Sequence, residues 1–245
     1  MRTNVVAVTG AASGIGAAIA REFAKQGWRV ALIDRDESVS ELATELDQAA
    51  YLVDVSSEPS VSDGARKIDA ELGSVDVLVN NAAVALLASA TEYTTTDWDT
   101  TMSTNLRGVF LCTREFARGM VDRGWGRVVN IASQNAIQGI GGHVAYSAAK
   151  AGILGMSRVL AAEWGPHGVT VNCVSPTLVD TPMSRATWPD AARAQVIERI
   201  PTAAWPPLMT SPRRCSTWRV RAQAWSTATT SSSTAVRASP SDGTR

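Results

Sequence analysis

Short apolar runs, many of them β-branched, recur along residues 1–201, and stretches with helical spacing separate them. The strands predicted from these runs are residues 5–9, 29–34, 51–55, 75–80, 127–132 and 169–175. Helical spacing predicts helices over residues 15–26, 61–72, 105–123 and 146–164. Strands that are apolar throughout need cover on both faces. The pattern therefore predicts an α/β fold with a doubly wound, Rossmann-like parallel sheet, whose ligands bind at the carboxyl ends of the strands.

Composition and charge narrow the classes of partner. The chain has 245 residues, is 45% apolar and carries 23 basic and 23 acidic residues, so neither nucleic acid nor a membrane surface is expected to bind it. No secretory signal is visible, and no run approaches the roughly 20 apolar residues of a membrane span. The three cysteines are far apart and lack metal-ligand spacing. We therefore expect a cytoplasmic protein with free thiols and no metal site.

A glycine-rich turn follows the first predicted strand and opens the first predicted helix. Gly10 permits a tight turn, Gly14 lets the backbone approach a pyrophosphate, and Gly16 allows close packing of helix on strand. Glycine-rich turns are also common without any ligand, but the position between strand and helix favours a dinucleotide site. The residues expected to contact the dinucleotide here are Gly10, Ser13, Gly14, Ile15 and Gly16.

Carboxylates end the next two predicted strands. Asp34 is placed to accept hydrogen bonds from the adenine ribose and to repel a 2′-phosphate, which favours NAD over NADP. Arg35 beside it has the charge to accept a phosphate, and a turn aspartate is the plainer interpretation of Asp34. Asp54 and Val55 are expected to meet the adenine ring.

Three further residues predict acid–base chemistry. Tyr146 and Lys150 are four residues apart in a predicted helix and so share a face. An ammonium beside a phenol favours the phenolate and should lower the phenol pKa from its usual value near ~10. Ser133 follows a strand end and is placed to bind a substrate oxygen. A tyrosine and a lysine on one helix face are common, so this interpretation depends on the glycine-rich turn and Ser133 as well.

These motifs together resemble the short-chain dehydrogenase/reductase family. Residues 9–16 resemble its TGxxxGxG loop, residues 80–83 its NNAG segment with Ala83 in place of glycine, and Tyr146 with Lys150 its YxxxK pair. The resemblance implies that Asn105 is a catalytic residue that orders a water in a proton relay from Lys150. It also implies that Asn81, Tyr146 and Lys150 contact the cofactor.

A looser resemblance links the chain to the L-xylulose reductase and sugar-alcohol dehydrogenase branch of that family. Pro176-Thr177 stands where the family usually has Pro-Gly, and the resemblance implies that Val179 and Thr181 hold the nicotinamide carboxamide. Residues expected at the substrate are Asn135, His143 and Trp188. The implied reaction interconverts a secondary alcohol, such as a sugar alcohol, and a ketone with NAD. A 3-oxoacyl thioester or general ketone reductase, and a nearly inactive dinucleotide-binding domain, remain alternatives.

Residues 202–245 differ from the rest of the chain. They hold six arginines, one acidic residue and many serines and threonines, which marks a boundary after residue 201. Read one base earlier, codons for residues 226–235 encode VNGDDLVVDG with suitable third bases, which resembles the family's last strand. We therefore expect a frame-shifted, poorly ordered tail, although a genuine disordered tail has the same composition. The expected sheet then has six strands, the seventh being missing or irregular, and a weakened homodimer or homotetramer.

Overall fold

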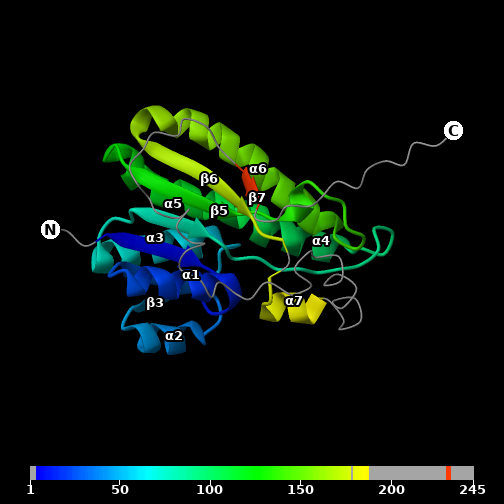
Figure 1. Cartoon of the computed structure of the whole chain (residues 1–245), viewed down its shortest axis with the longest axis horizontal. Helices are drawn as coiled ribbons and strands as arrows, with labels where there is room; N and C mark the ends of the chain where they lie inside the picture. Colours follow the sequence, from blue (N-terminus) through cyan, green and yellow to red (C-terminus); the bar gives the residue numbers. More distant parts are fainter. Residues whose placement is uncertain (1–3, 178, 188–229, 233–245) are drawn as a thin grey trace, which may run out of the picture.

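A parallel sheet forms the centre of the protein (Figure 1). The computed structural model describes residues 4–177, 179–187 and 230–232. The strands lie in the order β3-β2-β1-β4-β5-β6-β7, and each pairs in parallel with its neighbours. Their bounds are β1 (Val5–Thr9), β2 (Arg29–Asp34), β3 (Ala49–Leu52), β4 (Val77–Asn80), β5 (Gly126–Ile131), β6 (Val169–Ser175) and β7 (Thr230–Ser232). The predicted doubly wound sheet is confirmed.

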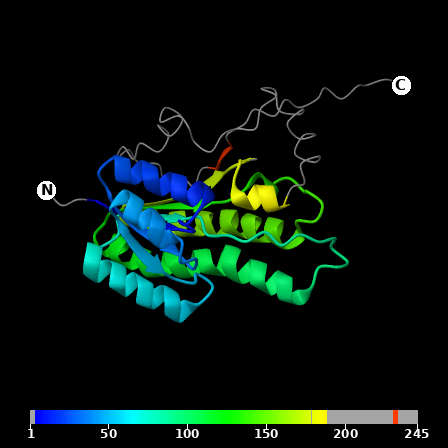
Figure 2. The ribbon, with the colours of Figure 1, turned by 90° about the horizontal axis from the view of Figure 1, so that it is seen from below.

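Helices cover both faces of the sheet. One face packs against α1 (Gly14–Lys25) and α2 (Val39–Leu46), through strand residues such as Val6 and Leu32. The other packs against α3 (Glu58–Leu72), α5 (Gly108–Asp122) and α6 (Val144–Trp164). Figure 2 shows the sheet between these two layers. Two shorter helices, α4 (Thr95–Met102) and α7 (Pro182–Thr187), lie towards the carboxyl ends of the strands.

The third strand differs from its prediction. We expected residues 51–55, whereas β3 is Ala49–Leu52. The backbone N–H of Val53 still donates to Asp34, but that of Asp54 turns to the hydroxyl of Ser60 (3.0 Å). The chain therefore leaves the sheet at Asp54, and the carboxylate ends up in the turn that follows the strand.

The sheet edge also differs from the expectation. We expected the outer edge of the sixth strand, away from β5, to be unpaired. Instead, Cys173 to Ser175 pair there with Thr230 to Ser232. A polar run can do this because strand pairing uses backbone N–H and C=O groups. The six expected strands are thus joined by a three-residue seventh, while residues 188–229 and 233–245, with most of the predicted tail, lie outside the described residues.

Within the part of the chain that the structure describes, every helix is too short or too polar to cross a bilayer.

Two glycines with left-handed backbones give a test of the packing. A Cβ at Gly168 (φ +73°) would overlap the carbonyl oxygen of Gly124, whereas a Cβ at Gly27 (φ +80°) would meet nothing within 4 Å. We expect Gly27→Ala to cost about 1–2 kcal/mol of unfolding free energy, from backbone strain alone. Gly168→Ala should cost more, because backbone atoms must move as well. Urea unfolding of both variants tests this, and equal losses would contradict it.

Candidate active site

A cleft of about 390 Å³ lies at the carboxyl ends of the strands. It is lined by residues that follow β1, β2, β3, β4, β5 and β6, together with the start of α6 and α7. The structure brings most of the predicted site residues to this cleft: Gly10, Ser13, Gly14, Ile15, Asp34, Asp54, Val55, Asn81, Ser133, Asn135, His143, Tyr146, Lys150, Val179 and Thr181. Gly16 and Asn105 are not among the residues that line it, and Trp188 lies outside the described residues.

The glycine-rich turn has the geometry that its sequence predicts. Gly10 and Gly14 adopt left-handed backbones (φ +66° and +56°), and a Cβ at Gly16 would overlap the carbonyl oxygen of Gly10. The side chain of Asn81 donates to the carbonyls of Thr9 and Gly10 (3.0 Å each), which ties the turn to the end of β4. The turn lines the cleft where α1 begins, so the free N–H groups of the helix start can face a phosphate, and the residues present fit a dinucleotide.

The part of the cleft next to the glycine-rich turn is acidic. Asp34 accepts hydrogen bonds from the backbone N–H groups of Ala12 (2.9 Å) and Asp36 (3.1 Å), which holds its carboxylate beside the glycine-rich turn. Asp54 accepts from the N–H (2.9 Å) and hydroxyl (2.7 Å) of Ser56. Asp36 and Arg35 also line this end. Three carboxylates and one guanidinium therefore surround the predicted adenosine position.

Ser133, Tyr146 and Lys150 meet at the centre of the cleft. Ser133 lies two residues after β5, and its oxygen accepts from the N–H of Asn135 (3.2 Å). Tyr146 and Lys150 come from the first turns of α6, and the lysine Nζ lies 5.6 Å from the tyrosine ring centroid. Lys150 is 2% exposed and donates to the carbonyl of Ile131 (2.6 Å). One strand end and one helix start thus bring all three groups together.

Burial changes the acidities of this pair in opposite directions. Desolvation raises the pKa of Tyr146, and a hydrogen bond with Ser133 acts against that rise. Desolvation also lowers the pKa of Lys150 to about 8. We expected the ammonium to lower the phenol pKa, and for this arrangement that was wrong. The ammonium hydrogen-bonds the Ile131 carbonyl, so burial has the larger effect on the phenol.

Asn105 lies in a π-helical turn, Ser103–Arg107, between α4 and α5. Its side chain is fully buried, with its oxygen accepting from the N–H of Val84 (2.8 Å) and its amide donating to the carbonyl of Val84 (2.8 Å). The water-ordering role implied for Asn105 stays a prediction. What its side chain does in this structure is fasten the segment after β4.

We call the part of the cleft around Asn135 and His143 the substrate end, because these residues were predicted to contact substrate. It also contains residues that were not predicted. His143 is buried, its Nδ1 lies 2.8 Å from the carbonyl oxygen of Gly141, and its ring meets that of Tyr146 edge-on at 6.2 Å. Asn135 is buried nearby. Our sequence reasoning missed Val84 and Ala85, which form part of the wall. The apolar run after Asn81 was the available signal, but it lacks the periodicity of a strand or helix.

A glycine-rich turn on the first strand of a doubly wound sheet, with a serine, tyrosine and lysine beside it, defines a nicotinamide-dinucleotide oxidoreductase. The family model described as short chain dehydrogenase matches residues 4–192. The chain therefore belongs to the short-chain dehydrogenase family, whose members act on small molecules.

Curated relatives share this body of the chain. A D-threitol dehydrogenase from Mycolicibacterium smegmatis is 45% identical over 206 residues, covering 81% of this chain and 79% of the relative. An NAD-dependent glycerol dehydrogenase from Listeria innocua is 38% identical, with coverages of 81% and 79%. An acetoacetyl-CoA reductase from Rhizobium meliloti is 41% identical, with coverages of 81% and 83%.

Solved structures share the fold. A putative NAD(P)-dependent gluconate 5-dehydrogenase from Beutenbergia cavernae, with bound NADP, superimposes with a TM-score of 0.79 at 35% identity. The match covers 83% of this chain and 84% of that protein. The relatives thus include proteins named for NAD and for NADP, and for both alcohols and thioesters.

The buried lysine generates a stability prediction. Because burial depresses the pKa of Lys150 to about 8, the unfolded chain binds the extra proton between pH 8 and about 10.5. Below pH 8 the folded chain buries a charged ammonium, which lowers the free energy of unfolding by the full amount. As the pH rises above 8, the buried amine becomes neutral and this loss of stability disappears. We expect wild type to gain up to about 3 kcal/mol of unfolding free energy relative to Lys150→Met across that window. Urea unfolding of both proteins from pH 7 to pH 10 measures the difference, and a constant difference would contradict the prediction.

Proposed function

We propose that this chain is an NAD(H)-dependent oxidoreductase that interconverts a secondary hydroxyl of a sugar alcohol and the corresponding ketone. The observation that carries the proposal is the meeting of Ser133, Tyr146 and Lys150 in one cleft with the glycine-rich turn. That cleft joins a site suited to a dinucleotide with a group that can take or give a proton.

Each residue of the cleft has a proposed part in the reaction. Hydride exchange is the chemistry that a nicotinamide dinucleotide supplies when it is bound. Ser133 holds the substrate oxygen, and Tyr146 removes the hydroxyl proton in oxidation or returns it in reduction. Lys150 favours the phenolate when its ammonium lies close to the phenol oxygen. Val179 and Thr181, on the segment that faces Gly14, are suited to hold the nicotinamide end.

Two observations favour a polyol as substrate. The relatives named for D-threitol and glycerol act on small polyols. Asn135 and His143 are buried at the substrate end, where polar side chains can bind a second hydroxyl. The relative named acetoacetyl-CoA reductase supports a second candidate, reduction of a 3-oxoacyl thioester. An idle dinucleotide-binding domain is the third.

Residues 202–245 bear on the choice between an active and an idle domain. We propose that they are the product of a shifted reading frame, in a cytoplasmic protein whose homodimer or homotetramer is weakened by this tail. The family model matches residues 4–192, and the two relatives each cover 81% of the chain, which supports a break near residue 201. The gene sequence tests this: a family-like ending must be recoverable by a single-base insertion or deletion.

A substrate panel tests the function. NADH fluorescence should rise with NAD and one or more four- to six-carbon polyols, whereas turnover only with acetoacetyl-CoA and a reduced cofactor would favour the second candidate. If neither this chain nor one with a repaired ending turns over any of these substrates, the result favours the idle domain.

Tyr146→Phe should reduce kcat for the best alcohol by roughly 10²–10⁴-fold, because the ring still packs but carries no exchangeable proton. The Kd for NADH should stay within about twofold of wild type, since the phenol acts on substrate. Steady-state kinetics and NADH fluorescence titration measure the two effects. Unchanged kcat, or lost NADH binding, would contradict the role of Tyr146.

Asp34 is expected to set the cofactor preference. Wild type should bind NADH more tightly than NADPH, because the carboxylate would face the added phosphate. Asp34→Asn keeps an oxygen for the Ala12 N–H and removes the charge, so the preference should fall by roughly tenfold, or about 1.4 kcal/mol. Asp36→Asn is the matched control and should change the preference less. Equal binding of both cofactors by wild type would refute the assignment.

A further inference from the structure

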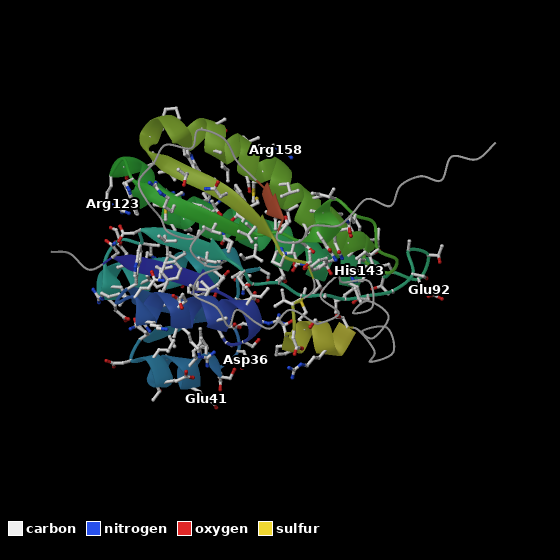
Figure 3. All side chains as sticks on the ribbon, viewed as in Figure 1. Asp36, Glu41, Glu92, Arg123, His143 and Arg158 are labelled. Atoms are coloured by element: carbon white, nitrogen blue, oxygen red, sulfur yellow. The ribbon has the colours of Figure 1, made fainter. Side chains whose placement is uncertain are left out.

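The segment between β4 and α4 projects from the carboxyl edge of the sheet. We call residues 84–93 the cleft arm. Figure 1 shows the arm running past the ends of the strands, and Figure 3 shows Glu92 near its far end, with His143 on the same side of the molecule. Val84 and Ala85, at its base, line the cleft.

Side chains fasten the arm to the π-helical turn and to α4. At the base, Asn105 holds both backbone groups of Val84. Further out, the hydroxyl of Tyr93 donates to the carbonyl of Leu86 (2.8 Å) and lies 3.1 Å from the hydroxyl of Thr101. Thr101 is fully buried on α4. Tyr93 therefore closes the arm on itself and anchors it to α4 through one oxygen atom.

The arm in turn contacts the loop that carries His143. The N–H of Ala88, two residues beyond Leu86, donates to the carbonyl of Gly142 (3.3 Å). Gly142 has a left-handed backbone (φ +79°), and a Cβ at Gly139 or Gly141 would meet nothing within 4 Å. A loop with so much glycine has little packing of its own, so its position depends on such contacts.

His143 completes the connection to the reacting groups. Its Nδ1 bonds the carbonyl of Gly141, and its ring packs against that of Tyr146. The arm and this loop thus form adjoining parts of the wall around the substrate end.

We propose that Tyr93 is a positioning residue for substrate, which acts by holding the cleft arm against the His143 loop. Its hydroxyl reaches no reacting group. Its effect passes through Leu86, Ala88 and Gly142 to the wall beside Tyr146. The inference rests on the proposed function, because it assumes that an alcohol or ketone binds against this wall.

The chain provides matched controls, because it has three tyrosines and phenylalanine removes the same atom from each. Tyr93→Phe should raise KM for the alcohol by roughly three- to tenfold, the effect of one lost hydrogen bond, with kcat and NADH affinity within twofold. Tyr51 bonds Glu71 (3.0 Å), away from the cleft, so Tyr51→Phe should leave all three constants unchanged. Tyr146→Phe should lose kcat.

Hydrogen–deuterium exchange supplies a readout that needs no turnover. Tyr93→Phe should speed exchange in peptides covering residues 84–93 and 137–143, and Tyr51→Phe should change neither. Unchanged exchange over residues 137–143 in Tyr93→Phe would overturn the proposal, whether or not the chain turns over an alcohol. Faster exchange there with unchanged KM in an active enzyme would also overturn it. Faster exchange in a chain that turns over no alcohol would leave the coupling standing and reject the proposed function instead.

Discussion

The burial of β1 between two parallel neighbours is the constraint on which the site depends. Val5 to Thr9 are at most 2% exposed, and they pair with β2 on one side and β4 on the other. Because the three strands run in one direction, their carboxyl ends meet at one edge. The glycine-rich turn after β1 therefore lies between Asp34 and Asn81. One side chain bonds Ala12 and the other bonds Thr9 and Gly10, so neighbouring strands hold the turn from both sides.

The central pair of titratable groups shows how burial and position act together. Desolvation favours the neutral form of both side chains, which raises the pKa of Tyr146 and brings that of Lys150 down to about 8. The ordinary pKa values of the two groups are 10.0 and 10.5, so burial reverses their order, and in the cleft the phenol holds its proton more tightly than the ammonium does.

Apolar runs and short motifs predicted most of the fold and the chemistry. The bounds of β1, β2 and β6 agree with prediction because each run is bounded by polar or glycine residues. Helix α4 was missed entirely, since Thr95 to Met102 contain poor helix formers and depend on the Thr94 cap. The cleft arm could not be predicted. Its contacts join Leu86 to Tyr93 and Ala88 to Gly142. The spacing of apolar and polar residues along the chain does not predict such contacts.

The two ends of the cleft are held by different kinds of contact. The end proposed for the dinucleotide depends on three glycines, Gly10, Gly14 and Gly16. Almost any other residue at these positions would have a strained backbone or overlap a neighbour. The wall at the substrate end relies on a few hydrogen bonds between an arm and a loop. Mutations that alter the wall are therefore expected to leave the glycine-rich turn unchanged. In evolutionary terms, a gene that encodes such a protein can reshape this wall by single steps while the glycine-rich turn stays the same.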